Sequence, residues 1–197
     1  MRILVTRPIE DGREISQKLE ARGHSVVAAP LLKIVLFDGP EIALDGVQAI
    51  LATSANGVRA IAGRTPRRDV PLFAVGPQTE AEARAAGFTH IKNAHGDGAA
   101  LARACLQWAN PQDGALLHAA GAEAPKLLQS ELEKSGFAVR REILYEAQAA
   151  THLPQAAANA LKNNALDTVM HFSSRSAAIF AALATQENLA SACENLV

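Results

Sequence analysis

The sequence predicts an α/β fold of two parallel-sheet lobes joined by a two-stranded β-ladder. Short apolar runs alternate with stretches of helical periodicity, which is typical of strands that cross over through helices into a parallel sheet. Two extended segments, at 31–37 and 140–145, break this alternation and are candidates to pair with each other. Similar strand-to-helix turns at Thr53 and at Ser173 also suggest two related lobes.

Apolar runs mark the expected strands, which span residues 2–6, 25–29, 47–52, 72–75, 115–118, 139–144 and 168–172. Helices fill the intervals between them. The first helix carries Ile15 and Leu19 on one face and ends near Gly23, a residue type that readily adopts the left-handed conformation found at helix ends. Gly87 and Gly136 end later helices in the same way.

The segment 31–37 follows a strand and Pro30 without an intervening helix, so it does not fit a simple crossover. If it runs antiparallel to the second extended segment, the two form a connector between lobes. The first lobe then contains residues 1–37 and 140–197. Residues 38–139 form an inserted second lobe, which the chain enters through the turn at Asp38-Gly39-Pro40.

Composition excludes several classes of function. The formal net charge is −1, and the basic residues form no stripe of the kind that neutralises nucleic-acid phosphates. Cys105 and Cys193 make no C-x-x-C pair, which argues against a disulfide framework or a zinc site and fits a reducing cytoplasm. No apolar run is long enough for a membrane span. We expect a cytoplasmic monomer without cofactor or metal that contacts neither membrane nor nucleic acid.

Three strand ends run directly into helices through turns rich in Ser, Thr, Asn and Gly. Such turns place hydroxyls and free backbone N–H groups at a helix N-terminus, which favours a carboxylate or phosphate. Any single turn is more often an ordinary helix cap. Together with an arginine just after the first strand, they favour an anion site. The candidate binding residues are Arg7, Thr53, Ser54, Ala55, Asn56, Gly76, Thr79, Ser173 and Ser174.

Tyr145 is the chain's only tyrosine and lies at the end of the presumed connector. Its phenol can donate a proton, although a lone tyrosine more often has a structural role. His118 and His171 lie near strand ends, where they can face the ligand or simply bond to the backbone. The six histidines show no i, i+4 pairing and no adjacent acid or cysteine, so no metal site is assigned.

Taken in order, these segments resemble the uroporphyrinogen-III synthase family. The matching segments are 3–8, 23–32, 53–58, 75–79, 144–146 and 172–176, which extend over nearly the whole chain. The resemblance implies two flavodoxin-like (Rossmann-like) lobes joined by the β-ladder. It also implies a linear tetrapyrrole substrate, hydroxymethylbilane, in which every pyrrole ring carries an acetate and a propionate.

The resemblance further implies the reaction: cyclisation to uroporphyrinogen III with loss of water and inversion of ring D, in haem biosynthesis. The family's tyrosine matches Tyr145, which is the expected general acid. Its threonine in the glycine-containing turn matches Thr79. The residues that match the carboxylate-holding turns are Thr53, Ser54, Ser173 and Ser174.

The sequence departs from the family pattern at two places. The family usually has a second glycine-turn-threonine element after one further strand, but the chain ends at Val197, so we expect the C-terminal part of the first lobe to be missing. Ala120 stands where the family often has an arginine, so no anion binding is assigned there. The alternative function is a non-catalytic two-lobed module that binds an anionic metabolite with the same turns and has no need of Tyr145.

Overall fold

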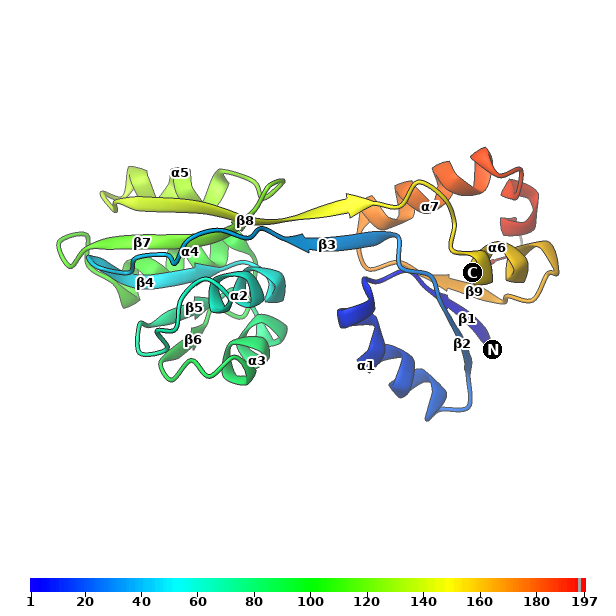
Figure 1. Ribbon diagram of the computed structural model, residues 1–197, viewed down its shortest axis with the longest axis horizontal. Coiled ribbons are helices and arrows are strands. Elements are labelled where there is room, and N and C mark those ends of the chain that lie inside the picture. The colour runs from blue at the N-terminus through cyan, green and yellow to red at the C-terminus, as the bar shows by residue number, and fades with distance from the viewer. Residues whose placement is uncertain (195) are drawn as a thin grey trace. The chain divides into compact units, whose positions relative to one another are not determined.

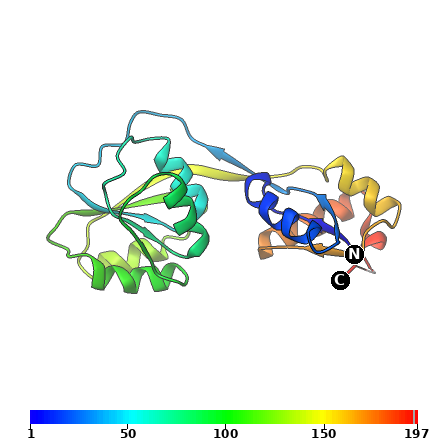
Figure 2. The same cartoon turned by 90° about the horizontal axis from the view of Figure 1, so that it is seen from below.

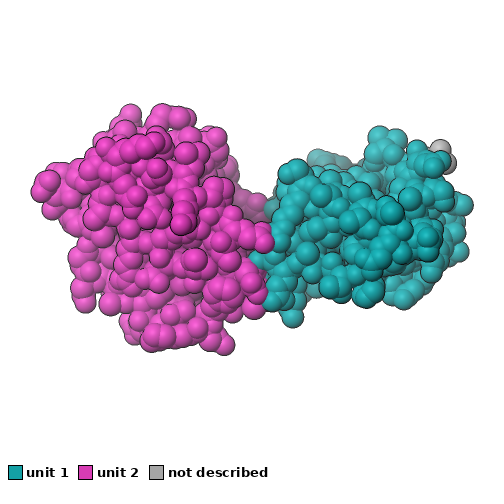
Figure 3. All heavy atoms as spheres, turned by 90° about the horizontal axis from the view of Figure 1, so that it is seen from above, with its two compact units in different colours: residues 1–34, 147–197 teal, residues 35–146 magenta. Residues whose placement is uncertain are grey.

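The computed structural model describes residues 1–194 and 196–197 (Figure 1). Internal contacts divide the chain into two compact units, coloured separately in Figure 3. The first unit contains residues 1–34 and 147–197, and the second contains residues 35–146. In the part of the chain that the structure describes, no helix is both long enough and apolar enough to cross a membrane.

The first unit is built on a three-stranded parallel sheet in the order β2-β1-β9. Its elements in chain order are β1 (Arg2–Val5), α1 (Ile9–Glu20), β2 (Ser25–Ala28), α6 (Gln155–Lys162), β9 (Thr168–Met170), α7 (Ser174–Gln186) and a 3₁₀ helix η1 (Ala190–Cys193).

Successive side chains of the central strand β1 point to opposite sides of the sheet, and they are buried on both sides. Ile3 and Val5 pack against Leu19 of α1. Leu4 lies in a separate cluster with Phe180 of α7 and residues of α6. Helix α1 therefore covers one face of the sheet, while α6 and α7 cover the other (Figure 1).

The second unit contains most of a six-stranded sheet in the order β3-β8-β7-β4-β5-β6. The elements are β3 (Leu32–Leu36), β4 (Val47–Ala52), α2 (Ala55–Ala62), β5 (Leu72–Ala74), α3 (Pro77–Ala85), β6 (Ile91–Asn93), α4 (Gly98–Trp108), β7 (Ala115–Gly121), α5 (Leu127–Lys134) and β8 (Val139–Ala149). The strand pairs β8–β7, β7–β4, β4–β5 and β5–β6 are all parallel.

Helices cover both faces of this sheet (Figure 2). Leu51 of β4 packs with Leu101 of α4 and Leu132 of α5 in one buried cluster. Helices α2 and α3 pack on each other and on the strands. A Cβ on Gly57 of α2 would lie 2.5 Å from the carbonyl oxygen of Ala119, so glycine lets α2 approach the backbone of β7 closely.

The mixed α/β fold with parallel sheets confirms the fold class in its coarser form, and every expected strand is present. The strands expected at 115–118 and 139–144 extend further, to Gly121 and Ala149. Strand β6 was not expected. It is three residues long and only partly buried, so it carries too little apolar alternation to be recognised.

Strands β3 and β8 are paired (Figure 1). The Phe37 N–H donates to the Leu144 carbonyl at 2.8 Å, and the Ala150 N–H donates to the Leu31 carbonyl at 2.9 Å. Residue numbers rise along one strand as they fall along the other, so the pair is antiparallel. The first half of β8 also pairs with β7, which is why the second unit extends to residue 146 rather than to the expected 139.

Candidate active site

Parallel strands end at one edge of a sheet, and ligands of such sheets bind there. In the second unit, Thr53 and Ser54 follow β4, and Gly76 follows β5. Strand β7, which lies beside β4, ends at Gly121. The fold therefore gathers the predicted turns of this unit at the carboxyl ends of neighbouring strands.

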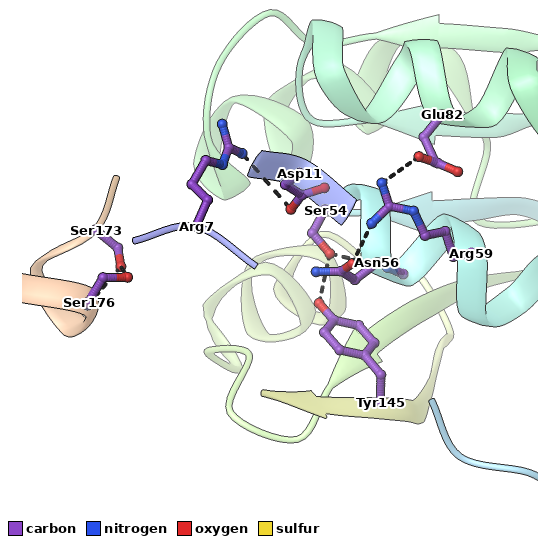
Figure 4. A network of polar contacts seen from close by, with 10 residues as sticks. Arg7, Asp11, Ser54, Asn56, Arg59, Glu82, Tyr145, Ser173 and Ser176 are labelled. Atoms are coloured by element: carbon purple, nitrogen blue, oxygen red, sulfur yellow. Dashed lines mark hydrogen bonds and ion pairs between the residues drawn. The ribbon is translucent and has the colours of Figure 1, made fainter. Parts of the chain in front are cut away.

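Ser54 and Tyr145 are joined by a hydrogen bond of 2.7 Å between their hydroxyls (Figure 4). Ser54 is the N-cap of α2, and its Oγ accepts a hydrogen bond from the Gly57 N–H at 3.1 Å. A serine hydroxyl has one proton to donate. Either hydroxyl of this pair can be the donor, because the Ser54 oxygen has a second lone pair beside the one that accepts from Gly57. When Ser54 donates to the phenol oxygen, the phenol proton is available for transfer.

The ring of Tyr145 is 9% exposed and lies against Gly121. Strand register sets this contact, because Gly121 is the partner of Tyr145 across the β7–β8 pair. Burial raises the pKa of the phenol above its ordinary value, and the hydrogen bond to Ser54 lowers it in part. The phenol is therefore protonated at neutral pH, as a general acid must be.

Thr53 contacts the buried side chain of His118, with 3.4 Å between Oγ1 and Nε2. His118 is 1% exposed, and burial, followed by the charge of Arg141, lowers its pKa to about 4. Among the described residues, His118 Nδ1 and Arg141 Nε and Nη1 are buried without a hydrogen-bond partner. His118 is therefore neutral at pH 7, and its ring contacts the side chain of Thr53.

This neutral histidine predicts a pH-dependent stability. A pKa lowered in the folded protein means that the unfolded chain binds the proton more tightly, so stability is lost as pH falls from about 6.5 towards 4. We expect His118→Leu to remove about 3 kcal/mol of the fall in unfolding free energy between pH 7 and pH 4. Urea denaturation at several pH values measures this. Parallel curves for the two proteins would contradict the prediction.

Asn56 lies in the first turn of α2, and a chain of polar contacts leads away from it (Figure 4). Its Oδ1 accepts a hydrogen bond of 2.8 Å from Arg59 Nη1. Arg59 Nη2 in turn donates to Glu82 Oε2 of α3 at 2.7 Å. Helices α2 and α3 are thus joined by an ion pair, which the sequence analysis did not predict, and Arg59 connects this ion pair to the first turn of α2.

The turn from β5 into the first turn of α3 contains Gly76 and Thr79, which differ in their surroundings. Gly76 has φ −162° and ψ 177°, an extended conformation open to any residue, and a Cβ there would meet no atom within 4 Å. A side chain at Gly76 would therefore occupy open space without straining the turn. Thr79 is 3% exposed in the first turn of α3, so a ligand reaches its hydroxyl only after neighbouring atoms move.

In the first unit, Arg7 follows β1 and lies over the ring of Phe172, 4.7 Å from the ring centroid. Its Nη2 is 3.9 Å from Asp11 Oδ2, one helical turn away on α1 (Figure 4). Thr6, which is fully buried, contacts His171 at 3.1 Å. The carboxyl ends of β1 and β9 therefore lie together, which brings Thr6 and Arg7 close to His171 and Phe172.

Ser173 is the N-cap of α7 and accepts a hydrogen bond from the Ser176 N–H at 3.1 Å. The two hydroxyls are also 2.9 Å apart (Figure 4). Ser173 and Ser174 are exposed, so the first turn of α7 is open to solvent. This turn repeats the cap geometry of Ser54 in the second unit.

A pocket of about 740 Å³ lies elsewhere in the second unit, lined in part by Phe73, Lys92 and Trp108. Its other lining residues include Gln48 and Pro71, which lie at the amino ends of β4 and β5. None of the predicted site residues lines it. Because ligand crevices of parallel sheets lie at the carboxyl ends, we place the candidate active site at the turns and not in this pocket.

The profile of a known protein family, described as Uroporphyrinogen-III synthase HemD, matches residues 13–196. The chain belongs to the uroporphyrinogen-III synthase family. No curated protein matches it. The family prediction made from the short motifs is thereby confirmed, as is the enzymatic function. The chain cyclises hydroxymethylbilane in tetrapyrrole biosynthesis.

Two solved uroporphyrinogen III synthases share the fold. The enzyme from Helicobacter pylori gives a TM-score of 0.61 at 16% identity over 93% of this chain and 78% of its own. A mutant enzyme from the extremely thermophilic bacterium Thermus thermophilus gives 0.57 at 16% identity over 100% of this chain and 82% of its own. At this level of identity the likeness supports the mixed α/β fold alone.

The sequence analysis did not single out three residues that contact this candidate site: Arg59, Glu82 and Gly121. Arg59 could have been recognised from the sequence, because it follows the Thr53–Gly57 turn by less than one helical turn. Glu82 gave no signal in the sequence, because its contact crosses from α3 to α2. Gly121 gave no signal in the sequence either, because its close contact with the ring of Tyr145 depends on the pairing of β7 with β8.

Proposed function

We propose that Tyr145 is the general acid of the cyclisation and that the first turns of α2, α3 and α7 bind the acetate and propionate groups of hydroxymethylbilane. We further propose that the two units are flavodoxin-like lobes connected by β3 and β8. The observation that carries the catalytic proposal is the 2.7 Å hydrogen bond between Tyr145 and Ser54. It places a protonated phenol at the N-terminus of α2, where the carboxylates are proposed to bind.

The first turn of α2 has unused donors. Ser54 accepts from the Gly57 N–H, but the N–H groups of Ala55 and Asn56 have no carbonyl partner inside the helix. The helix dipole adds a partial positive charge at this end. The Ser173 turn of α7 supplies the same arrangement in the first unit. These features suit a substrate that carries many carboxylates.

In the proposed first step, the phenol of Tyr145 donates its proton to the hydroxyl of the hydroxymethyl group, the C–O bond breaks, and water leaves. The product is an azafulvene cation paired with a tyrosinate, which accepts a hydrogen bond from Ser54. The far pyrrole then attacks through its substituted carbon to give the spiro intermediate, and ring D is inverted on closure. The proton that the last ring releases restores the phenol, so the sum is loss of one water.

The direct test supplies freshly generated hydroxymethylbilane and separates the uroporphyrinogen isomers. Because the free substrate closes without inversion, isomer III in excess of isomer I measures positioning by the protein. We expect mainly isomer III with the wild-type chain. A product mixture equal to that of the protein-free reaction would refute the proposed function.

The turn of α7 gives a prediction that separates binding from folding. Ser173→Ala removes the cap and a hydroxyl, and we expect a loss of about 1 kcal/mol in stability and in product affinity. Ser173→Asp retains a good cap but adds a negative charge, so we expect near-normal stability and weaker binding than Ser173→Ala. Thermal unfolding and equilibrium dialysis with uroporphyrinogen III measure the two effects. Equal or better binding by Ser173→Asp would exclude this turn from the site.

A further inference from the structure

We infer that Arg59 and Glu82 are positioning residues that hold the Asn56 amide with its N–H groups directed to a substrate carboxylate. This inference rests on the proposed function, because it assumes that the first turn of α2 binds carboxylates. It adds a side-chain donor to the backbone donors of that turn. Figure 4 shows the three residues and the contacts between them.

The chemistry of arginine fixes the orientation of the amide. A guanidinium only donates hydrogen bonds, so the atom of Asn56 that lies 2.8 Å from Arg59 Nη1 is the carbonyl oxygen. The Nδ2 group is on the opposite edge of the same planar amide. Its two N–H donors are therefore directed away from Arg59. A carboxylate is an acceptor for such donors.

The ion pair makes this orientation persistent. Glu82 Oε2 accepts from Arg59 Nη2 at 2.7 Å, and both side chains are about one-quarter exposed, at 26% and 25%. One guanidinium thus contacts α2 and α3 at once, which restricts its rotation. Arg59 lies in the last turn of α2, and Glu82 balances its positive charge.

A purely structural role for Asn56 predicts something different. If the residue serves only to accept the Arg59 hydrogen bond, an aspartate does this equally well, and it is also favourable in the first turn of a helix. If the N–H groups contact substrate, an aspartate of the same shape removes both donors and repels the carboxylates. Normal binding by Asn56→Asp would therefore exclude a contact between this side chain and the substrate, without a change of volume.

For Asn56→Asp we expect a thermal midpoint equal to or above that of the wild type, because the new carboxylate pairs with Arg59. We expect the Kd for uroporphyrinogen III and the KM for hydroxymethylbilane to rise about tenfold or more, because donors are replaced by a negative charge. kcat should change much less than KM. Wild-type Kd and KM in a stable Asn56→Asp protein would overturn the inference.

A double-mutant cycle tests the positioning role of Arg59. We expect Arg59→Met alone to raise KM by about threefold to tenfold with a smaller effect on kcat, and to have less than about a twofold effect in an Asn56→Ala background. Glu82→Gln should act in the same direction as Arg59→Met. Arg84→Met, which removes an exposed arginine of α3, is the control for lost positive charge. An equal effect of Arg59→Met in both backgrounds would show that Arg59 acts through its own charge, which overturns the inference.

The same experiments separate this inference from the proposed function. If Asn56 variants bind normally while Tyr145 variants lose turnover, the inference fails and the proposed chemistry stands. If the wild type does not enrich isomer III, the proposed function fails. Even then, the thermal midpoints and the Kd for uroporphyrinogen III still test the role of the Asn56 amide, because neither quantity depends on turnover.

Discussion

Tyr145→Phe is expected to lower turnover by about 10²- to 10⁴-fold, the usual contribution of a general acid. The ring keeps its place against Gly121, because phenylalanine differs only by the hydroxyl. Fold and affinity for uroporphyrinogen III should therefore stay near those of the wild type. Single-turnover assays with hydroxymethylbilane, together with thermal unfolding, measure these quantities. Wild-type turnover in Tyr145→Phe would remove the acid role.

The slow Tyr145→Phe enzyme should still form mainly isomer III. Chain conformation is set by the carboxylate-binding turns, whereas the phenol only assists departure of water. Ser54→Ala is the matched variant, because it keeps the phenol and removes its hydrogen-bond partner. A variant that yields mainly isomer I would instead show that Tyr145 shapes the bound conformation, or that azafulvene leaves the protein before closure. Product ratios at several enzyme concentrations separate these two outcomes.

Gly121→Ala is the second change for which we expect a large effect. A Cβ at this position would lie 2.8 Å from Tyr145 Cζ, 2.9 Å from Cε2 and 3.0 Å from the hydroxyl oxygen. The ring must move, and the hydrogen bond to Ser54 lengthens or breaks. We expect turnover to fall by about 10²-fold, as for other small displacements of a reacting group. Overpacking at a buried site should also cost about 1 to 3 kcal/mol of stability.

Two comparisons test the reason for the Gly121→Ala effect. Gly98→Ala adds the same methyl group where no atom lies within 4 Å, so it should leave turnover unchanged. In a Tyr145→Phe background, Gly121→Ala should cost little further turnover, because the proton donor is already gone. A large additional loss in that background would mean that Gly121 acts by another route, such as the conformation of the loop after β7.

The amino-acid sequence by itself determined the mixed α/β fold with parallel strands, all but one of the strands and the family. These features are encoded locally: apolar runs of strand length, helical periodicity, and turns where a strand passes directly into a helix cap. Strand β6 escaped because three half-exposed residues carry no such pattern. The turn residues Thr53, Ser54 and Ser173 could also be recognised from local sequence, since Ser and Thr hydroxyls at helix starts accept hydrogen bonds from backbone N–H groups.

Only the tertiary structure decided how those residues work together. Ser54 and Tyr145 are 91 positions apart, and Thr53 and His118 are 65 apart. Their contacts depend on the order and register of β4, β7 and β8, and a one-residue slip in register would turn Tyr145 to the opposite face. Local patterns identify a strand and its end. They do not specify which strand lies beside it or which side chain on that neighbour is brought within hydrogen-bonding distance.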